Sequence, residues 1–230
     1  MDTRVVIFVS PPGGGKGTQA DELVRRLGFV HLETSKIIED KFKTSDPNDP
    51  VIKRQKELWA SGKLMDSDVI MAWIINRIRE LAEQKQSISF SGSPRTMSEA
   101  ETELPLLAQL YGMQNIYIFH VYVSEETSIE RNSQRRICEA QRHPVPSTLE
   151  HKDVTVCPWD GSALVRRALD TAEVIQERYH VYEKETEPIV EFARHHGYHV
   201  VDLYGERPIS EVTQDILHVL DGTYKKPSGD

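Results

Sequence analysis

The chain has 230 residues and a formal net charge of −8, with 38% hydrophobic and 28% charged residues. This length suffices for one core domain that carries inserted subdomains. The acidic balance argues against a nucleic-acid partner, which would need a broad basic surface. No apolar run approaches the roughly 18 residues of a membrane span, so we expect a globular protein that has neither a nucleic acid nor a membrane as its partner.

The predicted elements begin with a strand close to Met1, which leaves no room for a signal or transit peptide. The chain has two cysteines, Cys138 and Cys157, too few for a disulfide framework. We therefore expect a cytoplasmic or at least intracellular protein, with an organelle left open. The sequence has no heptad pattern, so we expect a monomer.

This first strand, residues 4–9, is a continuous β-branched and aromatic run that is typical of a buried strand. A turn rich in glycine and proline follows at residues 10–17. Residues 18–27 then place apolar side chains on one helical stripe. The next predicted elements are a short strand and three helices, at residues 30–32, 34–43, 51–60 and 67–84.

The second half of the chain continues the alternation of strands and helices. In chain order, we predict a strand at 87–90, a helix at 97–111, a strand at 116–123, helices at 124–137 and 166–196, a strand at 198–203 and a helix at 209–220. The long helix should be kinked or broken near Pro188. Residues 138–164 have little periodicity and indicate an insertion or lid. The alternation favours an α/β fold with a parallel sheet.

The turn after the first strand reads Ser-Pro-Pro-Gly-Gly-Gly-Lys-Gly-Thr, residues 10–18, and has the strand-to-helix context of a phosphate-binding loop. Its glycines let consecutive backbone N–H groups turn toward one anion, and the helix N-terminus adds partial positive charge. Lys16 should reach the β- and γ-phosphates of ATP, and the Thr18 hydroxyl should bond a phosphate oxygen. The loop departs from the general pattern at Ser10, where glycine is usual, and at Gly17, where Ser or Thr is usual. The predicted ATP-binding residues of the loop are Pro12, Gly13, Gly14, Gly15, Lys16, Gly17 and Thr18.

The Gly-Lys-Gly-Thr-Gln sequence of this loop resembles that of the adenylate kinase family of nucleoside monophosphate kinases. Further segments resemble the family in the same order along nearly the whole chain. They are Gly62-Lys63-Leu64-Met65, Gly92-Ser93-Pro94-Arg95-Thr96, Arg131 with Arg135, Arg167 with Asp170 and Arg178, and the ending from Gly205 to Val212.

The resemblance implies a P-loop NTPase-like, three-layer α/β/α fold with a parallel five-stranded sheet and two insertions. The core domain would comprise residues 1–33, 66–136 and 166–230. Residues 34–65 would form a helical subdomain that binds the nucleoside monophosphate, and residues 137–165 would form the lid. These two insertions are the candidates for moving parts that exclude water.

The resemblance also implies the reaction, in which MgATP and AMP give two ADP reversibly, with Mg²⁺ bound together with ATP. Cations would converge on the phosphate chain and stabilise the charge of the transferring group. The implied catalytic residues are Lys16, Arg95, Arg135, Arg167 and Arg178. Arg131 would stack on the ATP adenine. The implied monophosphate-binding residues are Thr34, Leu64, Met65, Gly92, Arg95, Glu99, Arg167 and Arg178.

Three positions depart from the family pattern near the acceptor. Ser91 stands where the family has an aspartate that organises the magnesium water shell, and Asp170 is an alternative acid for that role. Glu39 stands where an arginine would bind the acceptor phosphate, with Lys36 as a possible substitute. Glu99 replaces a glutamine that reads adenine, and a carboxylate suits the donors of guanine better. Kinases for GMP or a pyrimidine monophosphate, and a catalytically weak ATP-binding sensor or scaffold, therefore remain alternatives.

The lid resembles the long type that carries zinc in this family. Cys138, Gln141, Cys157 and Asp160 occupy the positions of four ligands. Glutamine is a poor zinc ligand, so zinc binding at Cys138, Cys157 and Asp160 would require His143 or His151 instead. The preferred interpretation is a metal-free lid that hydrogen bonds and packing hold together.

Overall fold

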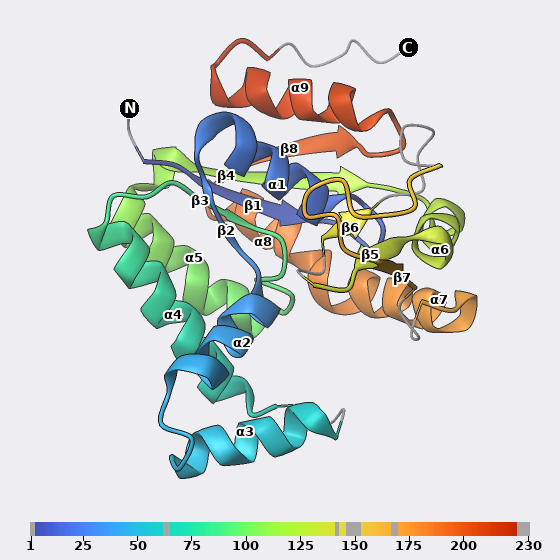
Figure 1. Ribbon diagram of the computed structural model, residues 1–230. Coiled ribbons are helices and arrows are strands. Elements are labelled where there is room, and N and C mark those ends of the chain that lie inside the picture. Colours follow the sequence, from blue (N-terminus) through green and yellow to red (C-terminus); the bar gives the residue numbers. More distant parts are fainter. Residues whose placement is uncertain (1–2, 62–64, 141–142, 146–152, 167–169, 225–230) are drawn as a thin grey trace.

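The core of the computed structural model is a five-stranded parallel sheet with strand order β2-β3-β1-β4-β8 (Figure 1). The structure describes residues 3–61, 65–140, 143–145, 153–166 and 170–224. The strands are β1 (Val5–Val9), β2 (Val30–Leu32), β3 (Ile88–Phe90), β4 (Ile116–Tyr122) and β8 (His199–Tyr204). The predicted parallel five-stranded sheet is confirmed.

Helices cover both faces of this sheet. They are α1 (Lys16–Leu27), α2 (Thr34–Thr44), α3 (Pro50–Ala60), α4 (Ser67–Glu83), α5 (Met97–Tyr111), α6 (Glu125–Gln134), α7 (Ala172–Val181), α8 (Pro188–His195) and α9 (Ile209–Leu220). Side chains alternate across a strand, so Val6 and Phe8 of β1 pack with α1 and α9, whereas Val5, Ile7 and Val9 pack with α4, α5 and α8. The continuous apolar run of β1 is thereby explained, because both of its faces are buried.

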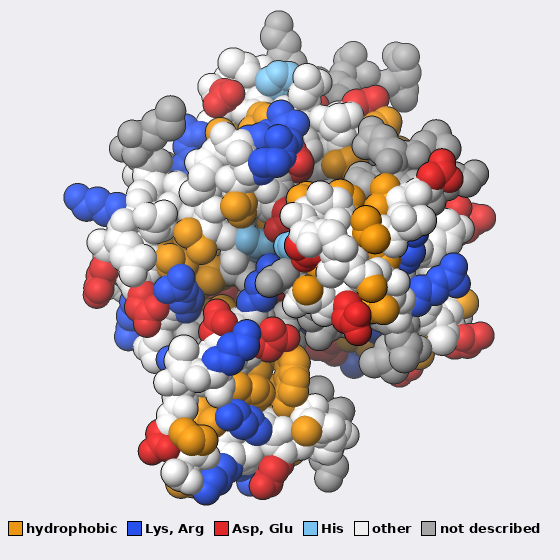
Figure 2. Space-filling model, in the orientation of Figure 1, with side chains coloured by type: hydrophobic (Ala, Val, Ile, Leu, Met, Phe, Trp, Pro, Cys, Tyr) orange, Lys and Arg blue, Asp and Glu red, His pale blue; other side chains and the backbone are white. Residues whose placement is uncertain are grey.

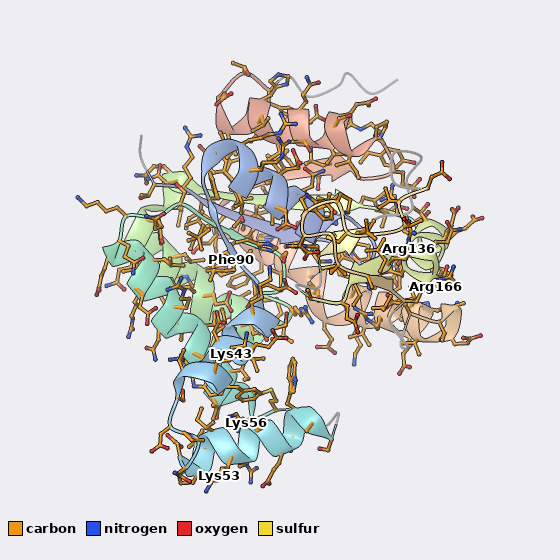
Figure 3. The ribbon with its side chains drawn as sticks, viewed as in Figure 1. Lys43, Lys53, Lys56, Phe90, Arg136 and Arg166 are labelled. Atoms are coloured by element: carbon orange, nitrogen blue, oxygen red, sulfur yellow. The ribbon has the colours of Figure 1, made fainter. Side chains whose placement is uncertain are left out.

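Helices α2 and α3 project from the core, below the sheet in Figure 1. Phe42 of α2 contacts Trp59 of α3 and Trp73 of α4 edge-on, with ring centroids 6.3 and 6.2 Å apart. Lys56 lies over the Phe42 ring at 5.7 Å, and Figure 3 labels it beside Lys43 and Lys53 on this projection. An aromatic cluster therefore holds the two projecting helices to α4.

The lid contains a small antiparallel sheet, with order β6-β5-β7, that the sequence did not predict. Its strands are β5 (Arg136–Cys138), β6 (Pro144–Val145) and β7 (Leu164–Val165). The helix predicted to reach residue 137 ends at Gln134, because Ile137 pairs instead with Pro144 and Val165. Arg136, labelled in Figure 3, donates to the carbonyl oxygen of Val154 at 2.6 Å and ties β5 to the next loop.

The long helix predicted at residues 166–196 is also shorter and more divided than expected. It begins at Ala172, where the Thr171 hydroxyl caps it by accepting from the backbone N–H of Val174. A π-helical turn, η3 (Tyr182–Thr186), separates α7 from α8, so the interruption begins before Pro188.

The surface mixes charges of both signs. Figure 2 shows basic and acidic side chains interspersed over the face that it displays. Within the described part of the chain, no helix combines the length and the apolar character needed to span a bilayer.

Candidate functional site

A cleft of about 1260 Å³ opens at the carboxyl edge of the sheet, between the phosphate loop, α2 and the lid. We call it the phosphate cleft. Its lining includes most of the residues predicted to bind nucleotide, namely Pro12, Gly13, Gly14, Gly15, Lys16, Gly17, Thr18, Thr34, Gly92, Arg95, Glu99, Arg131, Arg135 and Arg178. Met65 is described but does not belong to this lining. Leu64 and Arg167 lie outside the described residues.

The glycines of the phosphate loop are required by its shape. Gly13 and Gly15 have φ angles of 78° and 87°, which side-chain-bearing residues rarely adopt. A Cβ on Gly14 would lie 1.6 Å from the Ser10 Oγ. The Ser128 hydroxyl of α6 donates to the carbonyl oxygen of Pro12 at 2.7 Å and fixes the far side of the loop. These φ angles and contacts fix the conformation of the loop.

Lys16 lies at the centre of the positive charge in the cleft. Its Nζ donates to the carbonyl oxygens of Ser10 at 2.5 Å and Pro11 at 3.0 Å. Burial, together with weaker repulsion from Arg95, Arg178 and Arg135 in that order, lowers the pKa of Lys16 to about 7. Residues from four separate elements of the sequence therefore place four cationic groups close enough to repel one another.

Asp170 holds two of these arginines. Its carboxylate is 2.8 Å from Arg135 and 3.7 Å from Arg178, and only 4% of its side chain is exposed. Asp170 Oδ2 accepts a hydrogen bond from Arg135, whereas the buried Oδ1 has no hydrogen-bond partner among the described residues, so the alternative role of Asp170 toward the magnesium waters stays a prediction. The structure places Asp170 where it orients both guanidinium groups toward the cleft.

Arg131 connects two walls of the cleft. It donates to the carbonyl oxygens of Gly13 at 3.3 Å and Gly205 at 2.9 Å, joining the phosphate loop to the loop between β8 and α9. Burial lowers its pKa from the ordinary arginine value, and the nearby Glu206 opposes this effect. Its guanidinium lies on the cleft wall, and stacking on an adenine stays a prediction.

The opposite end of the cleft carries the predicted acceptor residues. Glu99 accepts from the backbone N–H of Arg95 at 2.5 Å, so one carboxylate oxygen is already engaged. The Thr34 hydroxyl donates to the carbonyl oxygen of Gly92 at 3.4 Å. Lys36 lines the cleft and Glu39 does not, so Lys36 is the cation of α2 that is placed to approach an acceptor phosphate.

A buried acid supports the segment that carries Arg95. Ser93 donates a short hydrogen bond to the fully buried Glu103 of α5. Burial raises the pKa of Glu103 to about 8, and the Ser93 hydrogen bond lowers it only in part. We therefore expect a protonated carboxyl group at neutral pH.

Further side chains line the cleft without belonging to any motif of the sequence, and three of them bear on the chemistry of the site. They are Trp59, Asp21 and His31. Trp59 could have been suspected from the sequence, because it is a large aromatic residue at the end of a predicted helix. The histidine and aspartate gave no such signal, because they lie on different elements and meet only in the folded chain.

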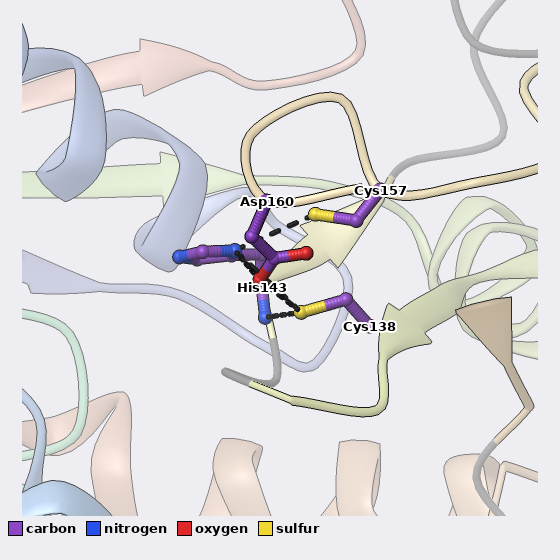
Figure 4. A group of neighbouring side chains, drawn as sticks. All are labelled: Cys138, His143, Cys157 and Asp160. Carbon is purple, nitrogen blue, oxygen red and sulfur yellow. Dashed lines mark hydrogen bonds and ion pairs between the residues drawn. The ribbon is translucent and has the colours of Figure 1, made fainter. Parts of the chain in front are cut away.

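The lid gathers four potential metal ligands in one cluster (Figure 4). One ligand atom from each of Cys138, His143, Cys157 and Asp160 lies within 4.8 Å of all the others. His143 Nδ1 is 3.5 Å from each sulfur and 3.2 Å from the Asp160 carboxylate. Both cysteines are buried, and burial raises the pKa of the Cys157 thiol. His143 thus takes the place predicted for a substitute of Gln141, whereas Gln141 and His151 lie outside the described residues.

Comparisons with known proteins agree with the geometry of the cleft. A family model described as adenylate kinase matches residues 8–198. A protein named adenylate kinase from Petrotoga mobilis is 29% identical over 94% of this chain and 96% of its own length. Relatives of the same name from Oceanobacillus iheyensis and Thermococcus kodakarensis are 31% and 30% identical, each over 94% of this chain, and the matches cover 98% and 93% of those relatives.

Proposed function

The chain belongs to the adenylate kinase family, and from this membership we propose that the phosphate cleft transfers the γ-phosphoryl group of MgATP to AMP, reversibly, giving two ADP. The observation that carries the proposal is the convergence of Lys16, Arg95, Arg135 and Arg178 on the wall of one cleft. Burial and, to a smaller extent, repulsion from the three arginines lower the pKa of the lysine. Asp170 pairs with only two of these four cations, so the cluster retains excess positive charge that favours a polyanionic ligand.

The phosphate loop and Lys16 bind the β- and γ-phosphates of ATP through backbone amides and an ammonium group. Arg95, Arg135 and Arg178 bind the transferring group and the acceptor phosphate, because planar guanidinium groups can each hold two phosphate oxygens. Arg167 joins them by family resemblance. No catalytic base is required, since the acceptor phosphate is already an anion. Magnesium arrives with ATP and offsets part of its charge.

The acceptor nucleotide occupies the end of the cleft near α2. Thr34, Gly92 and Glu99 line that end, and Leu64 and Met65 join them by family resemblance. Trp59 adds an aromatic face that a base can stack on. Residues 34–65 and 137–165 close over the two nucleotides and exclude water, which would otherwise accept the phosphoryl group.

The lid also binds a zinc ion through Cys138, His143, Cys157 and Asp160. Two sulfurs, one imidazole nitrogen and one carboxylate are ligand types that zinc takes in tetrahedral structural sites. Their mutual distances, all within 4.8 Å, suit a single central ion. Such a site would hold the short strands of the lid together. The monomeric and cytoplasmic state stays a prediction of the sequence.

An assay of ADP formation tests the proposed activity. The purified chain is given MgATP with AMP, GMP, CMP or UMP in turn. We expect rapid ADP formation with AMP and at least about tenfold slower formation with the others, since a site built to bond one base leaves buried polar groups unpaired with another. Preference for GMP would refute the acceptor assignment. Tight ATP binding without turnover on any monophosphate would indicate a sensor or scaffold.

A further inference from the structure

Three side chains, Asp21, His31 and Ser91, form a hydrogen-bonded chain along the wall of the phosphate cleft. His31 Nδ1 lies 2.8 Å from Asp21 Oδ1, and His31 Nε2 lies 2.6 Å from Ser91 Oγ. The imidazole is 8% exposed and all three residues line the cleft beside Lys16. The function proposed above gives these three hydrogen-bonded side chains no role.

The fold brings the three residues together from separate elements. His31 of β2 pairs with Ser89 of β3, so Ser91, two residues further on, lies on the same face at the carboxyl edge of the sheet. Asp21 lies on α1, the helix that begins at Lys16. The three hydrogen-bonded side chains therefore connect the helix of the phosphate loop to the segment that leads into Arg95.

For a neutral His31 ring, the chemistry of the groups assigns the direction of each hydrogen bond. Asp21 is about half exposed, and its carboxylate can only accept. His31 Nδ1 must therefore donate to it, which leaves Nε2 of the neutral ring as an acceptor. The Ser91 hydroxyl must then donate its proton to Nε2. Both lone pairs of Ser91 Oγ remain, so this hydroxyl presents only an accepting oxygen to the cleft.

We propose that Asp21 and His31 are positioning residues that hold the Ser91 oxygen as an acceptor for the magnesium ion of MgATP or for one of its water molecules. Magnesium prefers oxygen ligands and keeps several of its waters, which need acceptors in turn. A serine hydroxyl without this support would rotate and offer its proton to the anionic phosphates instead. The hydrogen bonds through His31 thereby compensate for the aspartate that the family has where this protein has Ser91. The inference rests on the proposed function.

The test compares ATP binding with magnesium and with a chelator, measured by isothermal titration calorimetry. Ser91→Ala and His31→Ala should each weaken MgATP binding about fivefold to tenfold, as expected for lost outer-shell support of a metal. Binding of metal-free ATP should change less than about twofold in both variants, because the phosphate loop is intact. The double variant should lose no more than either single variant, since both changes remove the same oxygen acceptor.

Two controls make the result specific. His120→Ala removes a histidine–carboxylate pair of the same sheet outside the cleft, with His120 Nδ1 3.0 Å from Asp202, and should alter neither binding constant. Ser91→Asp in the His31→Ala background should recover MgATP affinity, because a carboxylate accepts without a supporting histidine.

A spectroscopic readout addresses the proton directly. Long-range proton–nitrogen NMR should report neutral His31 as the Nδ1–H tautomer. The Nε2–H tautomer, additive losses in the double variant, or equal weakening of ATP with and without magnesium would each overturn the inference. Retained binding of metal-free ATP, together with ADP formation, would show that the proposed function stands even if the inference fails.

Discussion

The protonation of Lys16 should change when ATP binds. Burial and three neighbouring arginines lower its pKa to about 7 in the free protein, so the amine is mostly neutral at pH 8. The phosphates of ATP should raise this pKa again. Calorimetry at pH 8 in buffers of different ionisation enthalpy should therefore detect uptake of up to about 0.9 proton per ATP. A Lys16→Met variant should take up none, and equal uptake by this variant would assign the proton to another group.

Glu103 should make stability depend on pH in the opposite sense to ordinary surface carboxylates. Its pKa rises from 4.5 to about 8 on folding. Its stabilising contribution to the free energy of unfolding is therefore complete below pH 4.5, falls as the pH rises and is lost once the pH passes 8. Urea unfolding should show a slope of up to about 1.4 kcal/mol per pH unit in that window relative to Glu103→Gln, which retains the hydrogen bond to Ser93. Lys16 is present in both proteins, so its effect cancels. Parallel stability curves would contradict the protonated state.

Single residues were predictable where their neighbours in sequence carry the signal. The phosphate loop is contiguous, so spacing and flanks were enough to predict that Gly13, Gly14, Gly15 and Lys16 share one site, and all four line the cleft. Their binding of nucleotide stays a prediction. The pair Ser93–Glu103 and the chain through His31 arise from residues on separate elements, and no local pattern marks them.

The elements show the same limit at a larger scale. The strand at 30–32 and the helices at 97–111 and 209–220 match their predicted bounds. Local signals mark the helix ends, since Thr96 caps α5, Gly112 follows it and Pro208 precedes α9. The lid strands β5, β6 and β7 have two or three residues each and form only by pairing across the insertion. Their stability must come from contacts such as those of Cys138 and Cys157, which lie far apart in sequence.

A zinc ion bound in the lid should therefore be detectable by its amount per chain and by its effect on thermal stability. The purified chain, exposed to zinc and then freed of excess, should retain about one ion per chain by mass spectrometry of the metal content. Chelation should lower the melting temperature by several degrees.

His143→Ala and Cys138→Ser should each lose the bound ion, whereas Asp153→Ala, at an exposed lid position outside the cluster, should keep it. Full zinc content in His143→Ala would refute the assignment of the fourth ligand. A chain that never retains zinc would support the metal-free lid expected from the sequence.

At the scale of the whole molecule, the projecting helices should move toward the core when both nucleotides bind. Trp59 lines the cleft and is 40% exposed, so closure should bury it. The chain has three tryptophans. A Trp73→Phe, Trp159→Phe variant should thus report on Trp59 alone, with emission that shifts to shorter wavelength when MgATP and AMP are both present. An unchanged spectrum at saturation would argue against closure over the base.

The proposed activity depends most on the positive charge of the phosphate cleft, which comes from residues that lie far apart in sequence. The most direct test is the rate of ADP formation from MgATP and AMP by Lys16→Met compared with the unmodified chain. We predict a loss of at least about 100-fold in kcat, as expected when a preorganised charge aimed at the transferring group is removed. Unchanged turnover in a variant that melts like the parent would contradict the assignment of the cleft as the site of phosphoryl transfer.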